Sequence, residues 1–485
     1  MAVPTPSAPP ATPEVRTHAP VRAGRPEPGA VRRPEAGGAR VLELVTRAFG
    51  IGTAIAVAVA FTPREVGLAS ALVAFGTLVA EAASGAVLRA RAGRSDARAG
   101  GDSVSLFATL VIATAITVGL LAAKDEVAAL LGAFEIERML LLVVPLAVAG
   151  ACVRTLRRSR LGRRLDLGTL VAGILAVGTM LAFAALGKTV TAMLLGAGVA
   201  LGVEGVAVLR GARLVPSRAA WRGAWSTLHD ALAGLPASLL IAVLRRLDLF
   251  VVFAAYGPES AGVWCIARAI ALEPGRAVLG LLPAWRPTAP VWRLSRAPEL
   301  ILVPWLTGAA LLAPALVHDL VGPRWDAAAW FVRTLAPAGI ALLVANSLAR
   351  HARCGGWIAM PSLWLSAVAA FGGLCGADAF TGVVLAGASL AALARILRHA
   401  RRDSAGFASQ LTAIAGVGVA TLVSSCGLLG VVAFLQSRGR PAEELLVLAV
   451  ATGVVLHAAA TIGWVPFVRH AREARVPVSS RRLPS

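Results

Sequence analysis

Residues Leu239 to Pro283 read LLIAVLRRLDLFVVFAAYGPESAGVWCIARAIALEPGRAVLGLLP, two long apolar runs joined by a turn at Tyr256-Gly257-Pro258-Glu259. About 20 apolar residues in a helix span the hydrocarbon core of a membrane, and each run is long enough to do so. Charged residues nevertheless lie inside both runs, namely Arg245, Arg246, Asp248, Arg268, Glu273 and Arg276. Because a charge near the bilayer centre costs about 2.5–3.5 kcal/mol, these side chains need partners, a wet cavity or a function.

The rest of the chain repeats this apolar pattern. Of its 485 residues, 57% are hydrophobic and 15% are charged, whereas soluble domains contain about 45–50% apolar residues. The apolar runs predict an all-α polytopic membrane protein with about 14 transmembrane helices. They lie near residues 41–62, 66–88, 104–123, 136–153, 167–187, 190–209, 228–256, 260–283, 299–321, 326–349, 357–377, 379–397, 410–435 and 444–468.

The formal charge of +21 is distributed unevenly between the predicted loops. Most of the 47 Lys and Arg residues fall in the two terminal segments and in the even-numbered loops, and the odd-numbered loops carry few. Since Lys and Arg collect in cytoplasmic loops, this distribution predicts a multi-pass protein of the plasma membrane with both termini in the cytoplasm. It also accounts for the charge without nucleic acid as a partner.

The expected organisation has six parts. Residues 1–39 are rich in Pro, Ala, Gly and Arg, and a segment of this composition cannot bury enough apolar surface to fold. They are interpreted as a disordered basic cytoplasmic tail. The remaining parts are an N-terminal helix bundle over 40–210, a cytoplasmic linker over 211–227, a C-terminal helix bundle over 228–400, two additional transmembrane helices over 401–468 and a cytoplasmic tail over 469–485.

Several functional classes lack the sequence features they require. The segment Leu186-Gly187-Lys188-Thr189 misses the first glycine of a phosphate-binding loop, because Ala182 stands there. No soluble domain for an ATP-driven pump is visible. The five cysteines do not have metal-ligand spacing, so neither a metal nor another cofactor is expected. The predicted outer loops are short, the longest running from Ala123 to Glu135, which argues against an enzyme such as a polysaccharide polymerase or ligase.

A weak internal repeat relates the two halves of the chain. Residues 61–68 align with residues 256–263, so that Pro63 matches Pro258 and Gly67 matches Gly262. A fainter match sets Leu131-Gly132 against Val321-Gly322, each before a helix with an internal proline. Transporters built from two such halves bind substrate near the membrane midplane at the interface of the repeats. The repeat therefore predicts two helix bundles around a central cavity.

The turn regions carry a family resemblance. The segment Arg246-Leu247-Asp248, followed by Tyr256-Gly257-Pro258-Glu259-Ser260-Ala261-Gly262-Val263-Trp264, Ala267 and Pro283, resembles the seventh and eighth helices of polysaccharide flippases. Val66-Gly67-Leu68 is similar to the first turn of that family, and residues 320–328 are similar to its entry into the tenth helix. One departure is Trp264, where tyrosine is usual. The resemblance implies the multidrug/oligosaccharidyl-lipid/polysaccharide flippase superfamily, with two six-helix bundles, two C-terminal helices, alternating access and a lipid-linked sugar as substrate.

Helix geometry singles out candidate ligand-binding residues in the opening stretch. Asp248 precedes Pro258 by as many residues as Arg268 follows it, so both lie about 15 Å below the turn and can pair. Arg245 and Asp248 share one helical face and can also pair. Arg246 and Arg268 then remain as cations for a ligand. Guanidinium groups bind phosphate oxygens bidentately, so we expect them to hold a pyrophosphate.

Other charged residues are weaker candidates. Glu273 and Arg276 are spaced to pair with each other, although Arg276 can also extend to the inner interface. Glu81 and Arg333 face the same cost of burial and, with Glu273 and Arg276, are expected to line the cavity. Tryptophans near helix ends are typical of an aromatic belt at the membrane interface, and these are Trp285, Trp292, Trp305, Trp325 and Trp330.

The sequence thus favours a non-enzymatic flippase that moves an undecaprenyl-pyrophosphate-linked oligosaccharide across the cytoplasmic membrane for surface polysaccharide biosynthesis. Its expected partners are that lipid-linked oligosaccharide, membrane lipids, a polysaccharide polymerase and glycosyltransferases. A small-molecule or drug antiporter of the same superfamily is the first alternative, although a cavity for cationic drugs would favour acidic residues. A membrane-embedded polymerase or ligase is the second.

Overall fold

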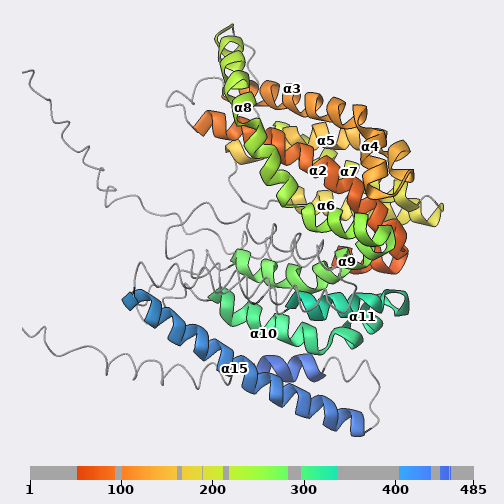
Figure 1. Cartoon of the computed structure of the whole chain (residues 1–485), viewed down its shortest axis with the longest axis vertical. Helices are drawn as coiled ribbons and strands as arrows, with labels where there is room; N and C mark the ends of the chain where they lie inside the picture. The colour runs from red at the N-terminus through yellow and green to blue at the C-terminus, as the bar shows by residue number, and fades with distance from the viewer. Residues whose placement is uncertain are drawn as a thin grey trace, which may run out of the picture.

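The computed structural model describes residues 52–92, 101–160, 167–187, 189–210, 218–281, 297–336, 340, 404–438, 448–457 and 459. Helices and short turns make up these residues, and no strand occurs among them. The helices predicted over 357–377 and 379–397 lie outside the described residues, as does the first half of the helix predicted over 41–62. Figure 1 shows two groups of helices, with α2 to α8 above and α9, α10, α11 and α15 below.

The first group is built around one helix rich in alanine. A helix over residues 52–60 is followed by α2 (Pro63–Ala92), α3 (Gly101–Ala122), α4 (Lys124–Leu131), α5 (Glu135–Arg160), α6 (Leu167–Ala185) and α7 (Thr189–Arg210). Ala80, Ala82, Ala83 and Ala86 on α2 are at most 1% exposed. Such small side chains let helices approach closely without a hydrophobic driving force, and α2 packs against α5, α8 and α9.

The second group continues the helical pattern. It comprises α9 (Leu247–Leu281), α10 (Ala297–Leu311), α11 (Ala313–Val321), the 3₁₀ turn η2 (Pro323–Trp325), a helix over 327–336 and α15 (Ser404–Ser437). α8 (Arg218–Leu244) precedes it in the sequence and belongs to the first group, where it packs on α2 and α3. A further helix covers residues 448–457. The element α4 was not predicted, since its residues were assigned to the longest outer loop.

The helix predicted over residues 228–256 is wrong as a single element. α8 ends at Leu244, Arg245 and Arg246 form a turn, and α9 begins at Leu247. The Arg246 amide donates to the carbonyl of Val243, three residues earlier, at 2.9 Å. This spacing is that of a 3₁₀ turn, which is wound more tightly than an α-helix with its bonds to the fourth residue back. The break changes the directions in which the two arginine side chains leave the backbone.

α9 contains the turn predicted from the opening stretch. Its backbone leaves the helical region at Gly257, where φ is 83° and ψ is 176°, a conformation that suits glycine alone. A straight helix would separate Asp248 from Arg268 by about 30 Å, yet their side chains form an ion pair. α9 therefore folds back at Gly257, and the predicted pairing of Asp248 with Arg268 is confirmed.

The turns of the two repeats meet each other. A Cβ atom on Gly67 would overlap the carbonyl oxygen of Pro258 and would lie 2.9 Å from the amide nitrogen of Gly262. Reciprocally, a Cβ on Gly262 would overlap the carbonyl oxygen of Pro63 and would lie 2.9 Å from the Gly67 nitrogen. The residues aligned in sequence thus contact one another symmetrically, which is the geometry of a two-fold axis between repeats.

The second sequence match also has a structural counterpart. α4 ends at Gly132, with φ of 65°, and α11 ends at Gly322, with φ of 97°. Each is a short helix that follows a longer one after a break, at Ala123 before α4 and at Leu312 before α11. The helices α10 and α11 meet at 77°. Because both matches reappear as equivalent elements, the structure supports a true internal repeat.

Two ends of the molecule can be defined from these elements. The turn end holds Pro63, Gly132, Pro258 and Gly322, and an ion pair of 2.6 Å between Arg64 and Glu135 lies there. The arginine end is opposite, where the final turns of α2 and α5 carry Arg89, Arg91 and Arg157.

The length and surface of the helices suit a membrane. Seven described helices are long and apolar enough to cross one, or eight if α10 and α11 count as one bent span. One of the seven is α9, which reaches that length only with its folded-back turn included. Large apolar side chains such as Leu141 and Leu240, 63% and 59% exposed, point outward. The prediction of an all-helical, multi-pass membrane protein is confirmed.

Candidate functional site

Glu81 on α2 is the centre of a group of charges inside the helix bundle. Its Oε1 atom lies 2.8 Å from Nη1 of Arg154 on α5 and 3.4 Å from Nη2 of Arg246. Its Oε2 atom lies 3.6 Å from Nη1 of Arg245. The Glu81 side chain is only 12% exposed, so a single carboxylate largely removed from water faces three guanidinium groups.

The break between α8 and α9 makes this arrangement possible. Successive residues of a continuous α-helix point about 100° apart, so Arg245 and Arg246 would leave such a helix on different faces. In the turn that joins α8 to α9, both side chains reach the carboxylate of Glu81. The two consecutive arginines therefore act at one place, although sequence spacing alone assigned them to different partners.

A second pair of charges adjoins the first group. Nη1 of Arg268 donates to Oδ2 of Asp248, whose side chain is 4% exposed. The other carboxylate oxygen of Asp248, Oδ1, is buried and has no hydrogen-bond partner among the described residues. Arg246 lies within electrostatic reach of Arg154, Arg268 and Asp248. The two groups thus form one unit, called the central cluster below, which consists of Glu81, Arg154, Arg245, Arg246, Asp248 and Arg268.

The central cluster carries an excess of positive charge. Four guanidinium groups face two carboxylates, which leaves a net charge of about +2 in a setting where charges are costly. Arginine pairs well with phosphate because its planar fork donates two parallel hydrogen bonds. An arrangement of this kind can bind a multiply charged anion, which would enter among the guanidinium groups and share them with Glu81 and Asp248.

Some of the partners predicted for the arginines of the site are wrong. The pairing of Arg245 with Asp248 is wrong, because the turn directs Arg245 to Glu81. Arg246 was expected to lack a protein partner, and it instead contacts the carboxylate of Glu81. Both corrections have the same cause, namely that the partner lies on an element distant in sequence or across a turn.

The remaining candidates divide between exposed and undescribed side chains. Arg333 is exposed on the helix over 327–336 and makes no ion pair with a described residue. Glu273 and Arg276 have a helical backbone in α9, but their side chains lie outside the described set. Arg154 was missed as a site residue, because it was counted among the basic residues of a loop. Its position in α5 gave no sign of a partner on α2.

Trp325 and Arg324 join the two groups of helices at the turn end. Nε1 of Trp325 donates to the Ala58 carbonyl at 2.7 Å, and Nη2 of Arg324 donates to the carbonyls of Ala58, at 2.9 Å, and of Val59. The last carbonyls of a helix have no partner within it, so η2 caps the helix over 52–60. Trp325 is fully buried, and its assignment to an aromatic belt is therefore wrong.

Replacement of Arg324 by alanine is expected to weaken this contact. The change leaves the carbonyls at the end of the helix over 52–60 with Trp325 alone, and the loss of charge-assisted hydrogen bonds should lower the free energy of unfolding by about 1.5–3 kcal/mol. Thermal unfolding of the purified protein in detergent measures the effect. Arg438→Ala is the control, since the one contact of the Arg438 guanidinium group with a described residue is with the ring of Phe434 on α15, at 5.3 Å. Equal losses in both variants would contradict a cap at η2.

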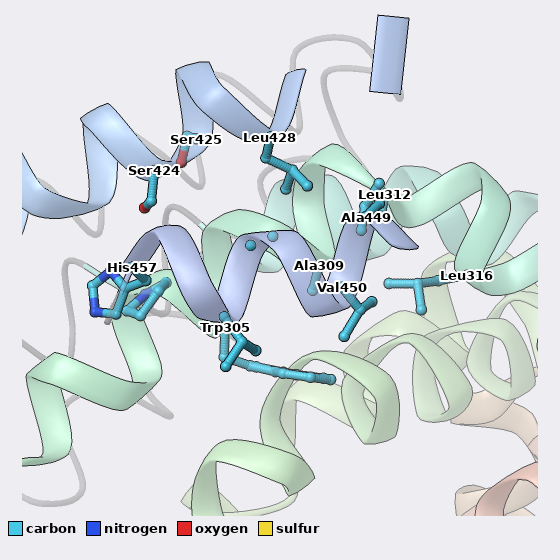
Figure 2. A pocket seen from close by; sticks show the side chains of 14 residues that line it. Trp305, Ala309, Leu312, Leu316, Ser424, Ser425, Leu428, Ala449, Val450 and His457 are labelled. Carbon is cyan, nitrogen blue, oxygen red and sulfur yellow. The ribbon is translucent and has the colours of Figure 1, made fainter. Parts of the chain in front are cut away.

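An apolar pocket lies within the second group of helices, away from the central cluster. It has a volume of about 350 Å³ and is walled by α10, α11, α15 and the helix over 448–457. Figure 2 shows Leu428, Val450 and Leu316 along its walls and Ser424, Ser425 and His457 toward one side. Its lining suits a hydrocarbon chain better than a sugar or an ion.

Comparison with known proteins identifies the fold. Searches with protein-family models and among curated proteins find no match. The chain is similar in structure to the lipid II flippase MurJ in an inward closed conformation, with a TM-score of 0.61 and 12% identity over 88% of this chain and 99% of that chain. It is less similar to an inward-facing multidrug resistance MATE transporter of the MOP superfamily, with a TM-score of 0.45 and 16% identity over 77% of this chain and 99% of that chain. A MOP superfamily transporter from Pyrococcus furiosus gives a TM-score of 0.41 and 16% identity over 77% of this chain and 96% of that chain.

The likeness to MurJ concerns the fold, since so few residues are identical. The described helices follow the fold of that flippase, which agrees with the two-bundle transmembrane fold that the resemblance of the turn motifs implied. Substrate, coupling and direction of transport do not follow from the fold. The central cluster is the candidate site from which a function has to be argued.

Proposed function

We propose that this protein of the flippase fold translocates an undecaprenyl-pyrophosphate-linked oligosaccharide across the plasma membrane for surface polysaccharide biosynthesis. The observation that carries the proposal is the central cluster, in which four guanidinium groups face two carboxylates at the junction of the two helix groups. A pyrophosphate is a compact anion of several charges, and it matches the net positive charge of the cluster.

In this proposal Arg246 and Arg268 hold the pyrophosphate, and the carboxylates regulate its release. Glu81 and Asp248 keep the guanidinium groups in place while the cavity is empty, because each carboxylate contacts at least one of them. A phosphate group would replace part of these contacts. The carboxylates would then compete for the arginines again, which keeps binding weak enough for the substrate to leave.

The turn end would be the outer seal of an alternating-access cycle. There the contacts of Gly67 with Pro258, Gly262 with Pro63, and η2 with the helix over 52–60 join the two repeats. In this proposal the arginine end faces the cytoplasm, as expected from the collection of Lys and Arg on that side. The contacts at the turn end must part before substrate can leave toward the outer leaflet.

The apolar pocket of Figure 2 fits the lipid part of such a substrate. In this proposal the glycan and pyrophosphate occupy the cavity between the repeats while the polyprenyl chain remains among apolar side chains and lipid. Glycosyltransferases would supply the substrate at the inner leaflet, and a polymerase would consume it at the outer leaflet. A drug antiporter fits less well, because cationic drugs would be repelled by the net charge of the central cluster.

Replacement of Arg246 by glutamine is expected to lower surface polysaccharide about tenfold or more in cells that depend on this protein, because the cluster loses one of its guanidinium groups. Surface glycan is measured by lectin or antibody staining, with membrane insertion checked by immunoblot. The control is Arg64→Gln, which removes an exposed ion pair worth about 0–1 kcal/mol at the turn end. An unchanged amount of surface glycan in the Arg246 variant would contradict the role of Arg246 in holding the pyrophosphate.

A further inference from the structure

A second pocket opens between α2 and α8, beside the central cluster and nearer the arginine end. Its volume is about 350 Å³, and its lining includes Glu81, Gly85, Arg89, Ser238, Ile241 and Arg245. The sequence suggested no role for Arg89 beyond a basic residue at the end of a helix. In the structure Arg89 belongs to the wall of this pocket.

The contacts of Arg89 hold its guanidinium group in a fixed position. Nε donates to the Gly85 carbonyl at 3.3 Å, and Nη2 donates to the hydroxyl of Ser238. Ser238 is 2% exposed and donates its own proton to the Gly234 carbonyl at 3.1 Å. The hydroxyl is therefore oriented to accept from Arg89. Of the donor atoms of Arg89, Nη1 has no hydrogen-bond partner among the described residues.

Arg245 supplies a second cation to the same pocket. Its side chain is 48% exposed, and its nearest described carboxylate oxygen, on Glu81, lies 3.6 Å away. This distance makes an ion pair but is too long for a hydrogen bond. Glu81 is the one carboxylate among the described residues that line the pocket, and it is shared with Arg154 and Arg246. The pocket thus presents two guanidinium groups that retain donors without a partner in the described part of the chain, and it carries a net positive charge.

The pocket lies on a path between the arginine end and the central cluster. Arg89 is about 12 Å farther along α2 than Glu81, at 1.5 Å per residue, while Arg245 belongs to both the pocket and the cluster. Basic pockets between transmembrane helices on the cytoplasmic side are suited to lipid phosphates. An anion held by Arg245 in this pocket would already contact a member of the central cluster, next in sequence to Arg246.

We propose that the pocket between α2 and α8 is an entry site, where Arg89 and Arg245 bind a lipid-borne phosphate group before it reaches Arg246 and Arg268. That this lipid is the substrate rests on the proposed function, whereas the phosphate chemistry of the pocket does not. Arg89 makes the binding contact, and Ser238 is a positioning residue that holds Arg89 toward the pocket.

The test measures lipid binding to the full-length protein in detergent, with two probes. One is undecaprenyl pyrophosphate, which carries the expected head group without the glycan, and the other is phosphatidylglycerol, an ordinary membrane lipid phosphate. The variant is Arg89→Gln, and the control is Arg91→Gln, which removes the same charge two residues on, where Nη1 of Arg91 donates to Ser105 at 3.2 Å outside the pocket. Arg89→Lys keeps the positive charge but loses the planar guanidinium group that donates two parallel hydrogen bonds to a phosphate.

We expect Arg89→Gln to weaken binding of undecaprenyl pyrophosphate about tenfold, Arg89→Lys to weaken it less, and Arg91→Gln to leave it within about twofold. A loss confined to phosphatidylglycerol would support the phosphate site and make its occupant a membrane lipid. Equal losses in the Arg89 and Arg91 variants, or none in Arg89→Gln, would overturn the site. This experiment measures lipid binding and not transport. A failure of the proposed function, which is tested with the Arg246 variant, can therefore be distinguished from a failure of the entry site.

Discussion

Replacement of Gly67 by alanine is expected to abolish translocation and to leave the turn end open. The new Cβ would overlap the carbonyl oxygen of Pro258 and come within 2.9 Å of the Gly262 nitrogen. Both neighbours are backbone atoms, so no side-chain rotation can relieve the overlap and the two repeats must separate at this point. Gly262→Ala should have the same effect, because it meets Pro63 in the equivalent way.

Cysteine labelling provides the measurement. Cys265 lies one turn beyond Gly262 on α9 and within hydrogen-bond reach of Ser70 on α2, so it lies between the repeats beneath the seal. In a chain that keeps this cysteine and carries serine at Cys152, Cys354, Cys375 and Cys426, a membrane-impermeant maleimide is added from outside. Labelling of Cys265 should rise strongly in Gly67→Ala.

The matched control is Gly202→Ala on α7, where an added Cβ meets no atom within 4 Å. This variant should keep both translocation and the low labelling of the parent chain. If Gly67→Ala also translocated normally, with Cys265 still protected, the contact between the turns would not be a seal.

Replacement of Arg268 by alanine is expected to be the most destabilising single change in the central cluster. It would leave the Asp248 carboxylate, 4% exposed, without the only cation that contacts it among the described residues. Removing one partner of a buried ion pair costs about 3–5 kcal/mol. The unfolding temperature in detergent should fall accordingly, and surface glycan should disappear.

A double variant separates the two effects. Asp248→Asn combined with Arg268→Ala removes the unpaired charge, so much of the lost stability should return. Translocation should not return, because the guanidinium group remains absent. Recovery of both properties would show that Arg268 serves the stability of the bundle alone, whereas recovery of neither would mean that asparagine cannot replace the carboxylate structurally.

The pairing of Asp248 with Arg268 could be predicted from the sequence by counting residues from the turn. Asp248 and Arg268 lie at similar distances from Gly257 along the chain, and any chain that folds back there must bring them together. The internal repeat could also be detected in the sequence, because the backbones contact each other so closely at Gly67 and Gly262 that only glycine fits at either position. Both features depend on geometry that a short stretch of sequence determines.

Contacts between distant elements could not be predicted in this way. Glu81 gathers arginines from α5 and from the turn after α8, and helix periodicity says nothing about which helices become neighbours. The turn at Arg245 and Arg246 interrupts an apolar run without Gly or Pro, the usual signals of a break. Trp325 had the position of a belt residue, but its indole caps a helix of the other repeat.

The central claim is tested most directly by reconstituting the full chain in liposomes and measuring movement of a fluorescent undecaprenyl-pyrophosphate-linked oligosaccharide between leaflets. The proposed function predicts movement that requires the protein and falls about tenfold or more in Arg246→Gln, while Arg64→Gln supports movement close to that of the parent chain. Movement at the same rate in protein-free liposomes, or undiminished movement with Arg246→Gln, would contradict it.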